Sequence, residues 1–193
     1  MPRQPTDTKN RILKAARGLY STYGCHGTTL DDIITSSGIT KGAFYHYFKS
    51  KSSLFEAMLD EVALDYRGLV ESIDPAIEPI EQLREVICRL AELNSSGQWG
   101  NCRLMLRLLG ESHESKPEIQ RRINDFWQWY TGFFEELLER CRDAGQVSAR
   151  LDNETQARLV MSLMAGAIML DKTAPGQSSF AGLADILIET LQL

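Results

Sequence analysis

The sequence has little of several features that would assign it to other classes of protein. It holds only four cysteines in 193 residues, none in a C-x-x-C pair, so we expect neither a disulfide framework nor a zinc module. Glycine and proline are too few for a fibrous or disordered chain. The longest uncharged stretch in the C-terminal half, residues 159–170, is too short to cross a bilayer. The first residues lack the apolar segment of a signal peptide, so we expect a cytoplasmic protein with no membrane partner.

The sequence also lacks the motifs of the common enzyme classes. It has no G-x-S-x-G, H-E-x-x-H, Walker or G-x-G-x-x-G motif, and its three histidines are isolated. We therefore expect no enzyme, no catalytic residue, no metal and no cofactor. Two alternatives of a different class stay open: an enzyme of a less recognisable kind, and a helical interaction module that does not bind DNA.

Charge is divided unevenly along the chain. The net charge is -5 at pH 7, yet residues 1–52 hold eight basic and three acidic side chains, while residues 53–193 carry a net charge of -10. A basic segment on an acidic body is typical of a phosphate-binding module attached to a body that does not bind phosphate. Chance clustering on a solvated face would give the same count, so charge alone leaves both interpretations open.

Apolar residues recur at the 3.6-residue period of a helix throughout the chain, and no segment alternates with the period of a strand. Glycine and proline residues separate the periodic segments. The expected N-caps are Thr6 or Thr8 for the first segment, Thr40 for the third, Asp152 for the eighth, and Ser178 or Ser179 for the last. The sequence therefore predicts an all-α protein of about nine helices. The expected segments are 6–23, 30–37, 40–48, 54–73, 80–94, 101–113, 117–145, 155–170 and 180–191.

The second and third segments predict a helix-turn-helix, because two short helices flank a turn containing Gly38. In that arrangement Lys41 can donate to guanine, His46 can meet a base edge, and Gly42 lets the backbone approach the bases. Hydroxyls and ammonium groups near the helix N-termini can hold phosphates and so fix the register. The candidate DNA-binding residues are Lys9, Thr28, Thr29, Thr40, Lys41, Gly42, Tyr45, His46, Tyr47 and Lys51.

Roughly residues 8–58 carry an ordered set of residues that is hard to obtain by chance. The set is Ala15, Ala16, Leu19, Tyr20, Gly24, Thr28, Thr29, Asp32, Ile33, Gly38, Ile39, Thr40, Lys41, Gly42, Tyr45, His46, Tyr47, Phe48, Lys51, Leu54 and Phe55. In this set the chain resembles the TetR-type bacterial transcriptional regulators. The resemblance implies a three-helix DNA-binding domain over residues 1–52 and a helical ligand-binding and dimerisation domain over residues 53–193.

The resemblance further implies a homodimer in which the last two helices of each subunit pair. A two-fold dimer would place two recognition helices on one face of double-stranded DNA, so we expect an inverted-repeat operator. The expected protein is a repressor that a small apolar inducer releases from this operator.

Aromatic residues are concentrated in the middle of the chain, where a cavity for such an inducer could form. An ordinary hydrophobic core would have the same composition. The aromatic content therefore predicts the region of a ligand site better than it predicts any single ligand-binding residue. The candidate ligand-binding residues are Trp99, Cys102, Met105, Phe126, Trp127, Tyr130 and Met164.

Cys102 supports an alternative hypothesis, in which the regulator senses electrophiles or oxidants. It follows Gly100 and Asn101 and precedes a helix holding Arg103 and Arg107, so a helix N-terminus and nearby cations could lower the pKa of its thiol. An inert buried thiol is the simpler interpretation, because free cysteine is commonly a small apolar core residue.

Overall fold

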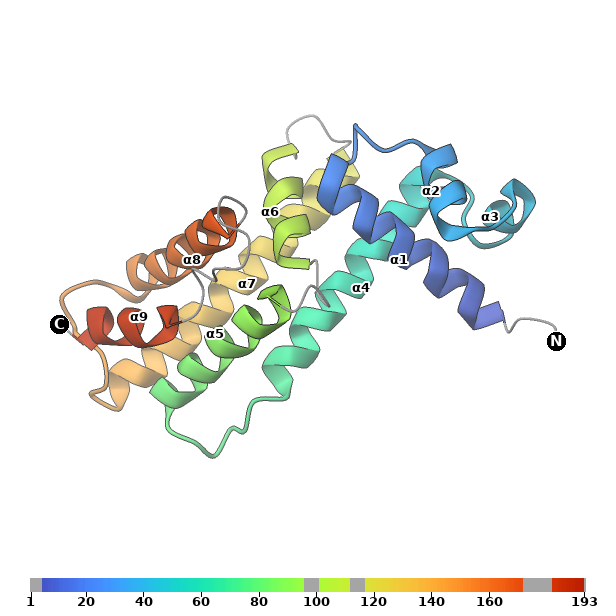
Figure 1. Cartoon of the computed structure of the whole chain (residues 1–193). Coiled ribbons are helices and arrows are strands. Elements are labelled where there is room, and N and C mark those ends of the chain that lie inside the picture. The colour runs from blue at the N-terminus through green and yellow to red at the C-terminus, as the bar shows by residue number, and fades with distance from the viewer. Residues whose placement is uncertain (1–4, 96–100, 112–116, 172–181, 193) are drawn as a thin grey trace. The chain divides into compact units, whose positions relative to one another are not determined.

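The computed structural model describes residues 5–95, 101–111, 117–171 and 182–192. The described residues form nine α-helices and no strand, so the predicted all-α fold is confirmed (Figure 1). The helices are α1 (Pro5–Tyr23), α2 (Leu30–Ser37), α3 (Lys41–Tyr47), α4 (Lys51–Glu71), α5 (Pro79–Ser95), α6 (Asn101–Glu111), α7 (Pro117–Asp143), α8 (Asn153–Leu170) and α9 (Leu183–Gln192).

Capping side chains determine where several helices begin. Thr40 and Asp152 accept hydrogen bonds from the backbone N–H groups of Ala43 and Thr155, which confirms both as the predicted N-caps of α3 and α8. The prediction was wrong at α1, which already begins at Pro5, a residue whose missing N–H costs nothing in a first turn. Ser178 and Ser179, predicted caps of the last helix, lie outside the described residues.

The chain divides into two compact units. The first comprises Met1–Asp65 and Arg103–Ile123, and the second comprises Tyr66–Cys102 and Asn124–Leu193. The domain boundary expected after residue 52 was placed by the sequence motif, and it does not coincide with the boundary of these units. Residues 53–65 and 103–123 belong to the same unit as the N-terminal helices. The roles expected for the two parts of the chain stay predictions.

The first unit is built around the packing of α1 on α2 and α4. Tyr20 and Phe55 are buried, and their rings meet edge to face with centroids 5.3 Å apart. Arg17 of α1 then donates hydrogen bonds to Glu61 (3.0 Å) and Asp65 (2.7 Å) of α4. In Figure 1, α2 and α3 lie beside α1, as the contacts between α1 and α2 require.

The second unit contains α5, α8 and α9, of which α9 contacts the other two. Gln82 is buried in α5 and satisfies its amide by donating to the carbonyl of Ile77 (2.7 Å) and accepting from Arg140 (2.7 Å). The N–H of Ser148 donates to the carbonyl of Leu191 (2.7 Å), which ties the middle of the α7–α8 connection to the end of α9. Among the described helices, none is both long and apolar enough to cross a membrane.

Replacing Gly38 by alanine is expected to lower the free energy of unfolding by about 1–2 kcal/mol. Gly38 has a φ of 63°, and an added Cβ would lie only 3.0 Å from the guanidinium of Arg11. Urea unfolding followed by circular dichroism measures the change. Gly42→Ala is the matched control, because the nearest atom to its Cβ would be 4.0 Å away and alanine favours helix by about 1 kcal/mol. Equal destabilisation of the two variants would contradict the assignment of strain to Gly38.

Candidate nucleic-acid interface

The turn between α2 and α3 is closed by backbone hydrogen bonds and by one arginine. The N–H groups of Gly38 and Ile39 donate to the carbonyls of Thr35 (3.1 Å) and Ile34 (3.3 Å), a C-terminal cap that the left-handed conformation of Gly38 permits. The Arg11 guanidinium of α1 donates to the carbonyls of Ser37 and Gly38. Sequence reasoning did not identify Arg11, because its partners lie 26 and 27 residues away and no motif contains it.

One face of α3 is buried and the other is offered to solvent. Phe44 and Phe48 lie four residues apart on the inner face, and both are buried. Tyr47 is half-buried, and the centroid of its ring lies 4.9 Å from that of His46. The exposed face consists of Thr40, Lys41, Gly42, Tyr45 and His46.

Two features of this face favour close contact with a groove of DNA. Beyond Gly42 there is open space, since an added Cβ would touch only the Thr40 hydroxyl at 4.0 Å. Lys41 lies 3.9 Å from the Asp31 carboxylate, but both side chains are largely exposed, so this ion pair is weak and the ammonium can turn to another acceptor.

The other predicted phosphate contacts occupy different environments. Lys9 and Thr29 are exposed, and Thr29 forms a capping box with Asp32, whose pKa is lowered by the hydrogen bonds from Thr29. Thr28 is buried and donates its hydroxyl to the carbonyl of Gly24 (2.8 Å). This hydroxyl closes the α1–α2 loop, and the expected phosphate contact of Thr28 stays a prediction.

Lys51 also serves the loop between α1 and α2. Its ammonium donates to the carbonyl of Cys25 at 2.6 Å and lies 5.9 Å from the centroid of the Tyr20 ring. The side chain is half-buried, and its ammonium holds the loop in place. A phosphate contact by Lys51 would have to use this same ammonium.

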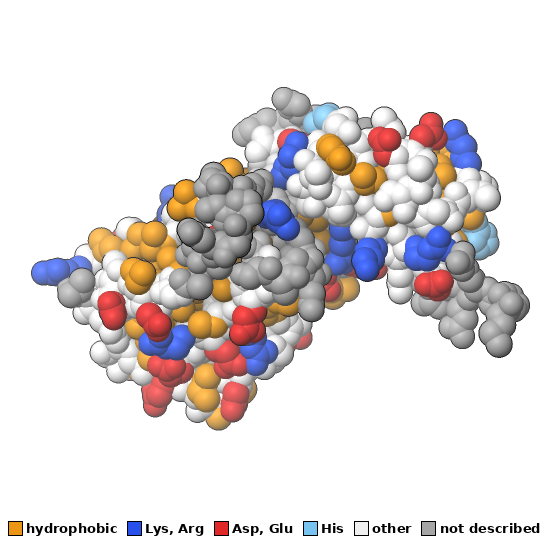
Figure 2. Space-filling model, in the orientation of Figure 1, with side chains coloured by type: hydrophobic (Ala, Val, Ile, Leu, Met, Phe, Trp, Pro, Cys, Tyr) orange, Lys and Arg blue, Asp and Glu red, His pale blue; other side chains and the backbone are white. Residues whose placement is uncertain are grey.

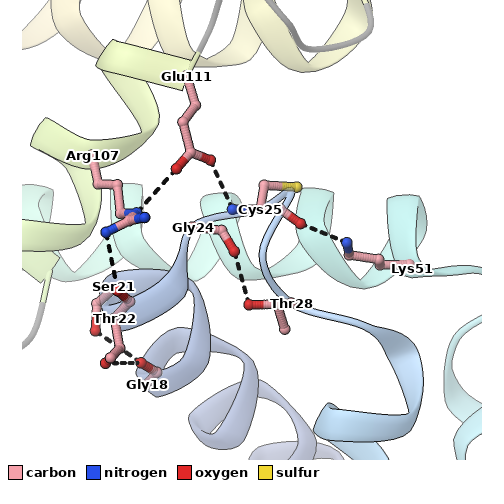
Figure 3. A network of polar contacts seen from close by, with 9 residues as sticks. All are labelled: Gly18, Ser21, Thr22, Gly24, Cys25, Thr28, Lys51, Arg107 and Glu111. Atoms are coloured by element: carbon pink, nitrogen blue, oxygen red, sulfur yellow. Dashed lines mark hydrogen bonds and ion pairs between the residues drawn. The ribbon is translucent and has the colours of Figure 1, made fainter.

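Figure 3 shows a polar network that connects α6 to this loop within the first unit. Glu111 accepts a hydrogen bond from the backbone N–H of Cys25 (2.8 Å) and one from Arg107 (3.0 Å). Arg107 also donates to the carbonyl of Thr22 (3.0 Å). The carboxylate approaches so closely that a Cβ on Gly24 would overlap it. Sequence reasoning missed this role of Arg107 and Glu111, since their loop partners are more than 80 residues away.

The thiol of Cys25 lies within this charged network. Burial raises its pKa, the Lys51 ammonium lowers it, and the Glu111 carboxylate raises it again. The thiol is therefore less ionised at neutral pH than an exposed cysteine.

The second unit brings together part of the predicted ligand set. Phe126 and Tyr130 are buried and stacked at 5.8 Å, and Tyr66, which sequence reasoning did not select, meets both rings at 5.0 and 5.3 Å. The Tyr66 hydroxyl donates to the sulfur of Cys102 at 3.3 Å. Cys102 is only 4% exposed.

Of the remaining members of the ligand set, only Trp127 has a described ring contact with this cluster. Met105 and Met164 are buried, but Met105 belongs to the first compact unit. Trp127 is half-buried, and its ring contacts Phe126 and Tyr130 at centroid distances of 5.6 and 6.1 Å. Its indole N–H is buried without a partner among the described residues. Trp99 lies outside the described residues.

The distribution of charge on the surface agrees with its uneven distribution along the sequence. Figure 2 shows Lys and Arg side chains spread over the part formed by α1, α2 and α3, with few acidic groups, while Asp and Glu side chains gather over the second unit. Among the described residues, no group of three or more His, Cys, Asp or Glu side chains is placed to hold a metal ion.

The helices that carry this interface match a known family. The profile described as "Bacterial regulatory proteins, tetR family" matches residues 12–58, which run from α1 into α4 and include the whole helix-turn-helix. The chain belongs to the TetR family. It is accordingly a DNA-binding transcriptional regulator.

Comparisons over most of the chain agree with this assignment to the TetR family. The chain is 27% identical over 166 residues to the probable acrEF/envCD operon repressor of Escherichia coli, covering 83% of this chain and 72% of that protein. A TetR-family regulator from Agrobacterium tumefaciens has the same fold, with a TM-score of 0.86 at 21% identity, over 98% of this chain and 100% of that one. FadR from Bacillus subtilis, solved in complex with stearoyl-CoA, has a TM-score of 0.74 at 19% identity, over 95% and 97%.

The charges around Cys25 predict opposite effects of two neutral substitutions. Glu111→Gln removes the carboxylate that raises the thiol pKa, so alkylation of Cys25 by iodoacetamide near neutral pH should accelerate roughly two- to tenfold. Lys51→Gln removes the ammonium that lowers the pKa, so alkylation should slow by a similar factor. Peptide mass spectrometry over a pH series measures both rates, with the exposed Cys88 as internal control. A change in the same direction in both variants would show that loop opening, and not charge, governs reactivity.

Proposed function

We propose that this TetR-family regulator is a ligand-responsive repressor that binds an inverted-repeat operator as a homodimer. The observation that carries the proposal is the exposed polar face of α3, which stands on buried Phe44 and Phe48 and has open space beyond Gly42. A short helix of this kind can enter a major groove while α2 braces it. The operator would lie across a promoter in bacterial DNA, so the proposal places the protein in the cytoplasm.

Support for the homodimer comes from the two C-terminal helices. Met169 and Leu170 of α8 and Ile186 of α9 are 55%, 57% and 62% exposed, whereas Leu187 and Ile188 are buried against the chain itself. A large apolar side chain in water is unfavourable, and a second copy of the same helices would cover all three. A two-fold arrangement would give an operator with matching symmetry.

Support for a ligand site comes from the aromatic cluster of Tyr66, Phe126 and Tyr130. Burial raises the pKa of both tyrosines well above the usual value, so their hydroxyls stay protonated. Such a cluster suits a largely apolar molecule that also accepts a hydrogen bond. FadR, which shares the fold, was solved with stearoyl-CoA, a ligand with a long apolar chain. The sensing role of Cys102 stays a prediction, and its burial means that an oxidant in solution has little access to the thiol.

The coupling between ligand and operator follows from linkage. Suppose the dimer has two forms, one with the two α3 helices spaced for the operator and one with them wrongly spaced. A ligand that prefers the second form weakens operator binding, at most by the ratio of its affinities for the two forms. The operator weakens ligand binding by the same factor. Release therefore needs no direct competition between the ligand and DNA.

Selection from a random DNA pool tests the proposal directly. The purified protein should enrich an inverted repeat, and its affinity should fall roughly a hundredfold or more between about 50 and about 200 mM salt. His46→Ala should weaken the selected site by about tenfold or more and relax the preference at one position of each half-site. Arg150→Gln, at an exposed position of the second unit, is the control. Enrichment of no sequence by protein shown to be free of ligand would contradict the proposal.

Ile186→Asp tests the dimer. A charge at this exposed position leaves the chain's own core intact but opposes its own copy across a two-fold interface. Sedimentation should show a shift from dimer to monomer, with a loss of operator affinity of about tenfold or more, since one half-site then binds alone. Leu64→Asp on α4, where leucine is 66% exposed, is the matched control and should stay dimeric. A dimeric Ile186→Asp variant would place the interface elsewhere.

A further inference from the structure

A hollow lies on the surface of the second unit, between the last two turns of α4 and the middle of α7. Its volume is about 290 Å³, near the lower limit for pockets that hold small ligands. The hollow is lined by Arg67, Val70, Glu71, Trp129, Gly132, Phe133 and Glu136.

This hollow uses a different face of α7 from the buried aromatic cluster. Phe126, Tyr130 and Phe134 follow one another at intervals of four residues and are buried. Trp129 and Phe133 are also four residues apart but are only half-buried. A single helix therefore carries two aromatic faces, one in the core and one turned toward the hollow.

The hollow already holds an organic cation of the chain itself. The guanidinium of Arg67 lies 4.9 Å from the centroid of the Trp129 ring, a cation–π contact. Glu71 and Glu136 line the same hollow, yet neither carboxylate forms an ion pair with Arg67 or with any other residue in the described part of the chain. Two carboxylates without an ion pair thus lie beside two aromatic rings.

We propose that this hollow is a binding site for a small organic cation, such as a substituted ammonium. Its lining carries one positive and two negative charges, and the faces of aromatic rings attract cations. A ligand cation would face Trp129 or Phe133 and draw on both carboxylates. The Arg67 side chain is exposed, so it can swing into water and leave the indole free.

The shape of the hollow suits a ligand of this class. Gly132 lies between the two rings along α7, and an added Cβ there would meet nothing within 4 Å, so the floor has room for a bulky head group. The volume admits a molecule of about ten heavy atoms and no long chain. This proposal goes beyond the regulator function and does not depend on operator binding.

Calorimetric titration of the full-length protein at low salt tests the site with three probes of similar size. Benzyltrimethylammonium should bind saturably with one site per chain, whereas benzenesulfonate and benzyl alcohol should not. Glu71→Gln combined with Glu136→Gln should weaken binding of the cation by about tenfold or more. Trp129→Leu should weaken it by about three- to tenfold.

Arg67→Gln gives the most discriminating result. Removing the chain's own cation frees the indole and leaves both carboxylates, so benzyltrimethylammonium should bind about threefold or more tightly. Glu139→Gln, an exposed position on α7 outside the hollow, should leave binding unchanged. Thermal unfolding confirms that each variant is folded. Glu71 and Glu136 are both exposed, so their substitution should not prevent folding.

Three results would overturn the proposal. Saturable benzenesulfonate binding that Arg67→Gln abolishes would make the hollow an anion site. Cation binding unaffected by the Trp129 and glutamate substitutions would place the cation elsewhere, for example at the buried aromatic cluster. Failure of benzyltrimethylammonium to saturate the unmodified protein or the Arg67→Gln variant would exclude a site for this class of ligand.

Discussion

The orientation of α3 depends on the turn between α2 and α3, because only a few residues are available there to reverse the direction of the chain. Gly38 adopts the left-handed conformation that reverses it, and Arg11 of α1 holds the carbonyls of Ser37 and Gly38. These contacts involve backbone groups of the turn and none of the exposed side chains of α3. The surface that would read DNA can therefore change from one regulator to another without loss of the fold that presents it.

Local signals were sufficient to predict the helices. Thr40 and Asp152 cap the helices that follow them, and Gly38 ends α2, because a cap needs only residues a few positions away. The part of the interface that was not predicted depends on contacts between distant residues. Arg107 and Glu111 form an ordinary pair on the surface of α6 when the sequence is read alone, and only the folded chain brings them to the α1–α2 loop.

The aromatic composition of the sequence pointed to α7, but it could not distinguish the buried face of this helix from the face at the hollow. Phe126 and Tyr130 join the buried cluster, whereas Trp129 lines a surface hollow only three residues after Phe126. Tyr66 completes the cluster from α4, and its sequence neighbourhood differs little from that of any core tyrosine. Which rings meet is decided by the packing of α4 on α7 within the second unit, and the period of one helix cannot specify that packing.

The net charge of -5 would discourage a nucleic-acid assignment if charges acted through the whole molecule. At physiological salt, however, exposed charges are screened within about 8 Å, so a phosphate responds to the groups next to it and not to the total. The basic excess of residues 1–52 can then act on DNA independently of the acidic residues that follow. The same screening limits the field of the second unit to its own surface, where an excess of carboxylates favours the approach of cations. Uneven division of charge thus allows one chain to present two surfaces that select for opposite charges.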